Sequence, residues 1–290
     1  MTGQVLLPDP SFLLRIGMTF DSAEFRITAE EAATKAGELV IRKWSEPREI
    51  RSKGFRDWVT DSDLAAQELI ASHILSRYPL HGFITEEDAP HLAPAGDVIW
   101  IVDPLDGTTN YSRKHPIFCV SVAAAITGVE GSLNVVAGAI YDPIRKELFS
   151  AATGRGSTLN GTPISVSPKG SLDTSIIGLD WSRGQYKRDA ILKALGGTAH
   201  KVHTIRSIGS AALALAWVAC GRLEVYFNLG VGSWDVAAAS VIIKEAGGLV
   251  SNYQGTTWSP DHSTCVASNG KIHQLFLETC QLAKWLDAPS

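Results

Sequence analysis

Two aspartates stand three residues apart in the segment WIVDPLDGTTNY, residues 100–111. Asp103 directly follows the apolar run VIWIV, which carries it to the end of an interior strand, where a carboxylate without a partner is costly. Pro104 and Gly107 hold Asp106 nearby. Two carboxylates this close in a partly buried site need either a cation between them or a shared proton. The spacing therefore predicts a metal site, with an acid/base aspartate pair as the alternative.

Other acidic residues stand at the ends of predicted elements. Glu86 follows a short strand in FITEED, Asp63 opens a helix in DWVTDSD, and Asp235 opens another in GSWDVAAASVIIKEAGG. Taken singly, the two aspartates have a structural explanation as helix caps or first-turn acids, each worth about 1 kcal/mol. Glu86 alone would be a solvated turn residue. Acids and carbonyls without a nearby His or Cys cluster are ligands for a hard cation, so we expect Mg²⁺ before Mn²⁺ or Ca²⁺.

The residues after the aspartate pair indicate which ligand the metal would serve. Gly107 lets the backbone approach a ligand closely, and Thr108 and Thr109 supply hydroxyls where a helix can begin. Successive backbone N–H groups at such a helix start can point at an anion. A metal site beside an anion-receiving turn favours phosphate ester chemistry.

Helix and strand patterns alternate along the chain without a linker or repeat. The sequence predicts an N-terminal extension over residues 1–25, one half over 26–155 and a second half over 156–290. TAEEAATKAGELVIRKW suggests a helix over 28–44 that opens with a capping box at Thr28. Unbroken apolar runs predict strands covered on both faces. The other expected elements are a helix at 61–77, strands at 97–102, 117–126, 133–141, 146–151, 175–180 and 223–227, and helices near 186–195, 209–220 and 235–246.

Composition bounds the class of protein. The 290 residues are 45% hydrophobic, with 26 basic and 30 acidic side chains and a pI near 6.1, which describes a globular chain with ample core. A formal charge of -4 supplies no overall field for nucleic acid or an anionic membrane. The four cysteines match no zinc or redox spacing, and no apolar run is long enough to span a bilayer. We therefore expect a reduced, cytoplasmic protein with neither nucleic acid nor membrane as partner.

Four segments in one order resemble a known family. DWVTDSD, FITEED, WIVDPLDGTTNY and GSWDVAAASVIIKEAGG are similar to the motifs of the inositol monophosphatase family of Mg²⁺-dependent, lithium-sensitive phosphatases. The resemblance extends from about residue 28 to near residue 270. It implies an α+β fold, the layered α-β-α-β-α sandwich of the inositol monophosphatase and fructose-1,6-bisphosphatase type. It also implies a homodimer with two or three Mg²⁺ ions per subunit, for which Mn²⁺ can substitute.

The resemblance also implies residue roles at the matching positions. Asp63, with Thr108, would position and deprotonate the attacking water, in an in-line displacement that needs no covalent enzyme intermediate. The backbone of Leu105 would join the acidic side chains around the metal. The implied metal ligands are Glu86, Asp103, Leu105, Asp106 and Asp235, the catalytic residues Asp63, Thr108 and Glu86, and the phosphate or substrate residues Gly107, Thr108, Ser182, Ser210, Ala211 and Asn228.

The substrate follows less directly from the motifs. DGTTNY followed by HPIFCVSVA is closer to the inositol monophosphatase type than to the nucleotide or histidinol phosphate types, so inositol monophosphate or a related sugar phosphate is expected. Inositol-specific members usually carry an acid seven positions before the WD aspartate, where this chain has Asn228. Asparagine lacks the charge-assisted hydrogen bond to a sugar hydroxyl, which favours relaxed specificity.

Several alternatives stay open from the sequence. The substrate could instead be 3'-phosphoadenosine 5'-phosphate, fructose 1,6-bisphosphate or histidinol phosphate. A different class of function is a non-catalytic regulatory or binding member that keeps the fold. Because every expected metal ligand is present, the sequence favours the enzyme.

Overall fold

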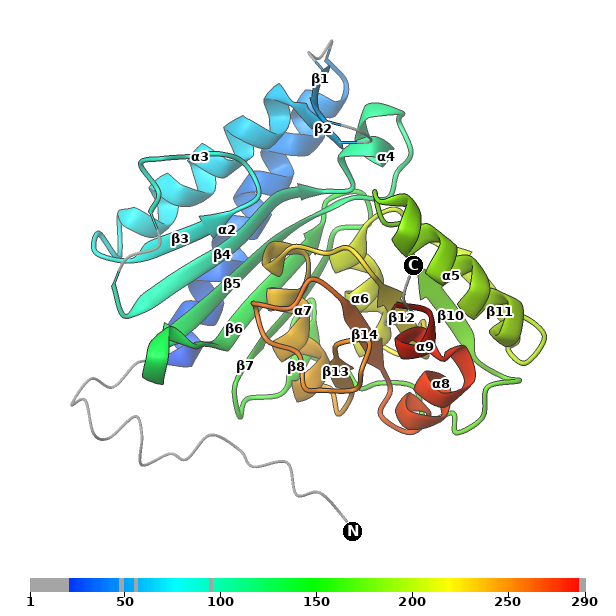
Figure 1. Ribbon diagram of the computed structural model, residues 1–290. Coiled ribbons are helices and arrows are strands. Elements are labelled where there is room, and N and C mark those ends of the chain that lie inside the picture. The colour runs from blue at the N-terminus through cyan, green and yellow to red at the C-terminus, as the bar shows by residue number, and fades with distance from the viewer. Residues whose placement is uncertain (1–20, 47–49, 55–56, 94–95, 287–290) are drawn as a thin grey trace.

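The computed structural model describes residues 21–46, 50–54, 57–93 and 96–286. Two β-sheets alternate with three helical layers, as Figure 1 shows. One apolar cluster lies between the outer helices and the first sheet, a second lies between the sheets, and a third lies beneath the last helices. The predicted α+β class and α-β-α-β-α layering are confirmed.

The first helical layer consists of α2 (Ser22–Trp44) and α3 (Asp61–Leu75). The predicted start of α2 at Thr28 is wrong, because Asp21, seven residues earlier, accepts from the backbone N–H of Ala23 and caps the helix. The Thr28 hydroxyl instead donates to the carbonyl of Glu24 inside the helix. This back-bonding is the other arrangement open to a threonine, and sequence pattern does not separate it from a cap.

The first sheet has seven strands in the order β3-β4-β5-β6-β7-β8-β9. β3 and β4 are parallel and the remaining neighbours are antiparallel. The strands are β3 (Gly82–Thr85), β4 (Val98–Asp106), β5 (Cys119–Thr127), β6 (Leu133–Asp142), β7 (Glu147–Ala152), β8 (Ser157–Leu159) and β9 (Thr162–Pro163).

An irregularity in β4 decides where its two aspartates point. Asp103 pairs with Ser121 and Asp106 with Cys119, so three steps along β4 match two steps along β5. In a regular strand, side chains an odd number of residues apart lie on opposite faces. A bulge inserts one extra residue and removes this alternation, which allows both carboxylates to lie on the same side.

Short elements flank the ends of the first sheet. β1 (Ile50–Gly54) and β2 (Asp57–Thr60) form a two-stranded antiparallel sheet just before α3. The helix expected after Gly107 is confirmed as α4 (Thr108–Ser112), and a 3-10 turn, η1 (Val129–Gly131), lies between β5 and β6.

The middle layer consists of α6 (Ala211–Ala219) and α7 (Ser233–Glu245), which lie between the sheets in Figure 1. Both are rich in alanine and deeply buried, so their backbones approach the strands closely. A Cβ placed on Gly138 of β6 would lie 2.7 Å from the Cα of Ala238 in α7. Glycine is required at this contact, which fixes α7 and therefore Asp235 against the first sheet.

The second sheet has the order β11-β10-β12-β14-β13. β10 is parallel to both β11 and β12, so the carboxyl ends of these strands meet at one edge. The strands are β10 (Ile176–Leu179), β11 (Thr204–Ser207), β12 (Val225–Asn228), β13 (Leu249–Ser251) and β14 (Cys265–Ser268); α5 (Gln185–Thr198), α8 (His273–Cys280) and α9 (Leu282–Leu286) cover the outer face.

Two predictions concern parts of the chain beyond this core. The N-terminal extension expected over 1–25 lies mostly outside the described residues, since the described chain begins at Asp21. In the part that is described, no helix combines the length and apolar character needed to cross a bilayer. All four cysteines are free, and three of them are buried.

Candidate active site

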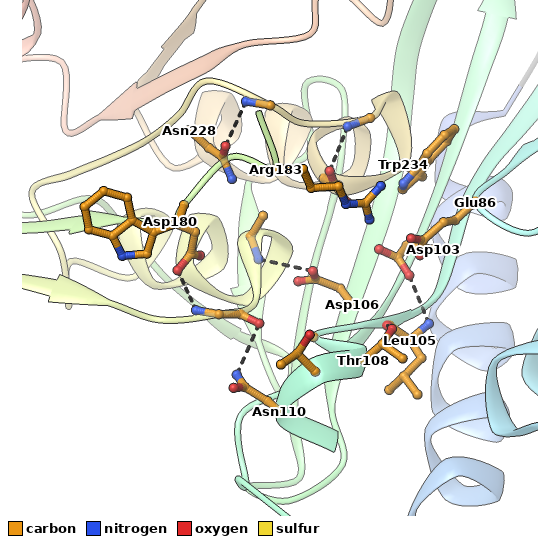
Figure 2. A pocket seen from close by; sticks show the side chains of 18 of the residues that line it. Glu86, Asp103, Leu105, Asp106, Thr108, Asn110, Asp180, Arg183, Asn228 and Trp234 are labelled. Atoms are coloured by element: carbon orange, nitrogen blue, oxygen red, sulfur yellow. Dashed lines mark hydrogen bonds between the residues drawn. The ribbon is translucent and has the colours of Figure 1, made fainter. Parts of the chain in front are cut away.

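A cavity of about 510 Å³ opens where the carboxyl end of β4 meets the starts of α6 and α7 and the edge of the second sheet. Figure 2 shows its lining residues, which come from both halves of the chain. On the side of the first sheet it is lined by Glu86, Asp103, Leu105, Asp106, Gly107, Thr108, Thr109 and Asn110. On the other side it is lined by Asp180, Trp181, Arg183, Arg188, Ser207, Gly209, Ala211, Asn228, Gly230, Gly232, Trp234 and Asp235.

Three aspartates form what we call the carboxylate cluster: Asp103, Asp106 and Asp235. Each offers one carboxylate oxygen, and these three atoms all lie within 4.8 Å of one another. Glu86, just after β3, lines the same cavity. The cluster joins Asp235 to two aspartates that lie at least 129 positions earlier in the sequence.

Burial and the crowding of like charges together raise the pKa values in the cluster. Burial raises the pKa of Asp103 well above its usual range, and the carboxylates of Glu86, Asp106 and Asp235 raise it further. Desolvation likewise raises the pKa of Asp235, with Asp106 and Glu86 adding to the effect. Ionised together without a counterion, these groups repel one another in a medium that screens charge poorly. The arrangement requires protons or a cation.

The start of α6 holds Asp106 in place. Its Oδ2 accepts from the Ser210 hydroxyl at 2.5 Å and from the Ala212 N–H at 2.7 Å, and its Oδ1 accepts from the Ala211 N–H at 3.2 Å. Burial raises the pKa of Asp106, and these hydrogen bonds oppose the rise by stabilising the ionised form. The helix N-terminus thus orients one carboxylate of the cluster toward the other two.

Asp235 is oriented by its own helix. It occupies the third position of α7, and its Oδ2 accepts from the Gly232 N–H at 2.7 Å in the manner of a capping box. The sequence explanation of this residue as a first-turn acid is therefore correct. Capping uses one carboxylate oxygen, and the residue also belongs to the carboxylate cluster.

Gly107 makes the turn between the cluster and α4. Its φ of 98° is in the left-handed region, and a Cβ there would lie 3.0 Å from the carbonyl oxygen of Ile117, so only glycine fits. The Thr108 hydroxyl that follows lies 3.1 Å from Oδ1 of Asp63, to which it can donate, and equally far from the carbonyl oxygen of Leu105. The turn joins Asp63 to the cavity through a single hydroxyl.

Asp63 is fully buried and does not line the cavity. Its Oδ2 accepts from the Thr60 N–H at 2.8 Å and from the Thr60 hydroxyl at 2.5 Å, which completes the capping box of α3. Desolvation raises its pKa to about 6, although the hydrogen bonds from Thr60 oppose the rise. A carboxyl group with this pKa can accept or release a proton close to neutral pH.

A polar network lies on the side that the second sheet contributes, and we call its members Asp180, Tyr226 and Asn228 the Asp180 network; Asp180 and Asn228 line the cavity, and Tyr226 is buried behind them. Asp180 follows β10, and its Oδ1 accepts from the N–H groups of Ile208 at 2.9 Å and Gly209 at 2.6 Å. Its Oδ2 accepts from the Tyr226 hydroxyl at 2.9 Å, which in turn accepts from the Asn228 amide at 3.3 Å. Burial raises the pKa of Asp180 to about 6, against the effect of these donors.

Aromatic and basic side chains complete the outer part of the cavity. Trp181 is 39% exposed, and the Arg188 guanidinium lies 5.8 Å from the centre of its ring. Arg188 also donates from Nε to the carbonyl of Ser182 at 2.7 Å, which anchors it. Arg183 lines the same cavity and is labelled in Figure 2. Two basic side chains, Arg183 and Arg188, therefore line the same cavity as the carboxylates.

The predicted site residues fall into two groups. Most line the cavity, but Asp63, Ser182 and Ser210 lie outside its wall: Asp63 contacts Thr108, and Ser210 contacts Asp106. Sequence reasoning missed Asp180, Trp181, Arg188, Asn110 and Trp234, which also line it. Asp180 stands directly after an apolar strand, the same signal that identified Asp103, and Asn110 and Trp234 lie inside the motifs WIVDPLDGTTNY and GSWDVAAASVIIKEAGG.

The residues present suit a hard divalent cation. The donors are carboxylate oxygens and backbone carbonyls, which Mg²⁺ and Mn²⁺ prefer, and the cluster contains neither sulfur nor imidazole. Cys119, whose thiol lies 3.6 Å from Oδ2 of Asp106, is the nearest sulfur to that carboxylate among the hydrogen bonds of the described residues. Burial raises the pKa of this thiol well above its ordinary value, so it stays protonated near neutral pH.

Comparison with known proteins agrees with the geometry. The model of the inositol monophosphatase family matches residues 21–284. Inositol monophosphatase 1 of Solanum lycopersicum is 38% identical over 91% of this chain and 97% of its own length. Nus factor SuhB of Salmonella typhimurium is 39% identical over 86% of this chain and 92% of its own. The solved structure of the extragenic suppressor protein suhB from Bartonella henselae has a TM-score of 0.83 at 31% identity and covers 89% of this chain and 98% of its own.

The layered fold with its carboxylate cluster defines a class of metal-dependent proteins that act on phosphate esters. The chain belongs to the inositol monophosphatase family.

Proposed function

We propose that the protein is a Mg²⁺-dependent phosphatase of small phosphate monoesters. The observation that carries the proposal is the convergence of Asp103, Asp106 and Asp235 within 4.8 Å, beside the turn at Gly107. These aspartates come from two distant parts of the chain, and their mutual repulsion gives a stable packing no evident reason to gather them. A divalent cation gives that reason.

Glu86, the carboxylate cluster and the carbonyl of Leu105 would hold the cations. When bound there, Mg²⁺ would lower the pKa of a water molecule bound to it and stabilise the negative charge on the departing ester oxygen. The backbone N–H groups of Gly107 and Thr108 are proposed to orient the phosphate, because a turn with this conformation directs N–H groups toward an anion.

Asp63 and Thr108 are proposed to handle the proton of the attacking water. The Thr108 hydroxyl accepts a proton from water and passes its own to Oδ1 of Asp63, across the 3.1 Å contact that already joins them. The pKa of Asp63, raised to about 6, matches this task, since a general base works best near the operating pH. Its two contacts with Thr60 keep the carboxylate oriented.

The substrate is proposed to be inositol monophosphate or a related sugar phosphate. The side of the cavity facing the ester's alcohol part carries the amide of Asn228 and the carboxylate of Asp180, both suited to hydrogen bonds with hydroxyl groups. Asn228 binds a hydroxyl without the charge assistance of an acid, which supports broad rather than inositol-specific activity. Fructose 1,6-bisphosphate, 3'-phosphoadenosine 5'-phosphate and histidinol phosphate remain the alternative substrates.

A binding or regulatory role is the second candidate. It rests on the relatives named Nus factor SuhB, which are as similar to this chain as the relatives named inositol monophosphatase. A cytoplasmic location and a homodimer stay predictions under either function.

A panel of phosphate monoesters assayed with and without Mg²⁺ separates the two candidates. The panel contains inositol 1-phosphate, fructose 1,6-bisphosphate, 3'-phosphoadenosine 5'-phosphate and histidinol phosphate. Release of phosphate that depends on Mg²⁺ and stops in EDTA supports the phosphatase. If no ester is hydrolysed at any Mg²⁺ or Mn²⁺ concentration, the binding role is the better account.

A further inference from the structure

Two side chains bind the short connection between β11 and α6. Residues 208 and 209 lie in this connection, and each has one N–H group and one carbonyl group to satisfy. Oδ1 of Asp180 accepts from the two N–H groups, at 2.9 Å and 2.6 Å. Nδ2 of Asn110 lies 3.1 Å from each of the two carbonyl oxygens, to which it can donate. Figure 2 shows dashed bonds that lead from Asp180 and from Asn110 to the same piece of backbone.

Asn110 is itself fixed in the first half of the chain. It is the third residue of α4, and its backbone carbonyl accepts from the N–H of His115 at 2.9 Å. Its Nδ2 also lies 2.9 Å from the carbonyl oxygen of Ile117, so the two amide hydrogens are shared among three acceptors. The side chain therefore joins the segment after the metal motif to the connection before α6.

Two glycines allow this close approach. A Cβ on Gly209 would lie 2.7 Å from Nδ2 of Asn110, and the φ of this glycine, 79°, is in the left-handed region. A Cβ on Gly107 would lie 3.2 Å from the carbonyl oxygen of Gly209. Because neither residue has a side chain, the backbones of the two halves meet directly at the turn that follows Asp106.

Asp106 and Asn110 bind one continuous stretch of the second half. Asn110 donates to the carbonyls of residues 208 and 209, and the Asp106 carboxylate accepts from groups of residues 210–212. The chain from 106 to 110, the chain from 209 to 212 and these bonds together form a closed ring. Asp180 belongs to the same half as the stretch that it binds, so its bonds do not set the distance from that stretch to Asp106.

We propose that Asn110 is a positioning residue for the metal centre, because it holds the connection before α6 where residues 210–212 can orient the Asp106 carboxylate. Partners that orient a metal ligand in this way commonly govern metal affinity. The effect on metal binding rests on the proposed function, since it requires a cation at the carboxylate cluster. The hold on the start of α6 does not depend on it.

Metal affinity tests the proposal without turnover. Binding of Mn²⁺ to the full-length protein is measured by calorimetry in the wild type and in Asn110→Ala. The affinity should fall about tenfold, the lower end of the range for loss of an outer-shell partner. With Mg²⁺ and the most active ester, the Mg²⁺ concentration that gives half-maximal activity should rise by the same factor, while kcat at saturating Mg²⁺ stays close to that of the wild type.

Asn269→Ala is the matched control. The Asn269 amide also donates to two carbonyl oxygens of a distant segment, those of Ser167 at 3.0 Å and Lys169 at 2.8 Å, and none of these residues lines the cavity. Loss of this amide should lower the free energy of unfolding and leave Mn²⁺ affinity unchanged. The pair of variants therefore separates a positioning role from a contribution to stability alone.

Hydrogen exchange tests the hold on α6 without metal. In EDTA, mass spectrometry follows amide exchange in the peptide that contains residues 208–212. Asn110→Ala should speed this exchange about tenfold, which corresponds to one hydrogen bond, whereas Asn269→Ala should not change it. Asn110→Ser keeps a hydroxyl donor and should show a smaller change in the same direction. It takes the place of the alanine variant if that protein does not fold.

The outcomes separate this inference from the proposed function. Unchanged exchange of residues 208–212 in the Asn110 variants overturns the hold on α6. Wild-type affinity for Mn²⁺ in these variants, or an equal loss in Asn269→Ala, overturns the positioning role at the metal centre. A wild type that binds neither Mn²⁺ nor Mg²⁺ overturns the proposed phosphatase. Faster exchange in Asn110→Ala would still support the hold on α6 in that case.

Discussion

The two sheets present buried carboxylates to the cavity in opposite ways. Asp103 belongs to the first sheet and Asp180 follows a strand of the second, and both come at the end of an apolar run. Burial raises the pKa of Asp103 well above the ordinary range and the carboxylates around it raise it further, whereas hydrogen-bond donors around Asp180 oppose the effect of burial and its pKa rises to about 6. Donors satisfy a buried carboxylate, but neighbouring carboxylates leave it dependent on a cation. The difference supports the proposal that Asp103 binds the metal and that Asp180 faces the substrate.

The largest expected effect comes from replacing Asp103, on the side of the cavity formed by the first sheet. Asp103→Asn removes a charged oxygen from the cluster, so kcat/KM with Mg²⁺ should fall by more than the roughly 100-fold that loss of an outer-shell partner costs. Steady-state kinetics on the most active ester of the panel measures it. Asp97→Asn, the same change on an exposed residue, should keep full activity. If Asp103→Asn were as active as the wild type, the proposed difference in role between Asp103 and Asp180 would be wrong.

The next effect concerns the pH dependence of stability on the side of the second sheet. The pKa of Asp180 is about 6 in the folded protein against 3.8 ordinarily, so between these values the folded state holds more protons than the unfolded state. Stability therefore falls as pH rises through this window. Asn does not titrate, so from pH 4 to 7 the wild type should lose about 2 kcal/mol more than Asp180→Asn. Urea unfolding at several pH values measures this difference. If the free energy of unfolding changed with pH by the same amount in the wild type and in Asp180→Asn, the raised pKa of Asp180 would be contradicted.

The third prediction concerns Asn228→Asp, which adds a carboxylate to the side of the cavity formed by the second sheet. Asn228→Asp keeps an acceptor for the Gly230 N–H, now 2.9 Å from Oδ1, and adds a negative charge that strengthens a hydrogen bond to a substrate hydroxyl. The ratio of kcat/KM for inositol 1-phosphate to that for phenyl phosphate should rise about tenfold. Asn134→Asp, the same change at an exposed residue of β6, serves as the control. An unchanged ratio would mean that residue 228 does not contact the sugar.

The smallest effect comes from removing the Tyr226 hydroxyl, which joins Asp180 and Asn228 in the Asp180 network. Tyr226→Phe deletes the hydroxyl that donates to Oδ2 of Asp180 at 2.9 Å, so unfolding should become easier by about 1 kcal/mol. Loss of a donor also raises the pKa of Asp180 further, which moves the fall in stability to higher pH. Unfolding curves recorded on the variant at the same pH values measure both. A variant as stable as the wild type at every pH would show that the hydroxyl is dispensable.

The site residues of the first half could be predicted from the sequence because most of them lie close together along the chain. Asp103, Asp106 and Gly107 lie within five residues of one another, directly after an unbroken apolar run. The layered fold followed from the same apolar runs and from the resemblance. The bulge that places both aspartates on one side was not foreseen, because it depends on pairing with β5 rather than on β4 alone.

The second half was harder because its residues act through distant contacts. Asp180 accepts hydrogen bonds from Ile208, Gly209 and Tyr226, which lie between 28 and 46 positions away. No local sequence motif predicts these contacts. Ser210 was expected to bind substrate, but it donates to Asp106, 104 positions earlier. The start of α2 was misplaced for a smaller reason, since Thr28 suits a cap and a helix interior equally well.

The contact between Gly138 and Ala238 lies in the interior, away from the cavity lining. It nevertheless determines how close Asp235 lies to the other two aspartates of the carboxylate cluster. A methyl group on Gly138 would force α7 outward, because the backbone of Ala238 cannot yield as a flexible side chain can. Asp235 stands one turn from this contact on the same helix and would retreat with it. Substitutions in the interior of β6 are therefore expected to weaken binding of the proposed metal without altering any of its proposed ligands.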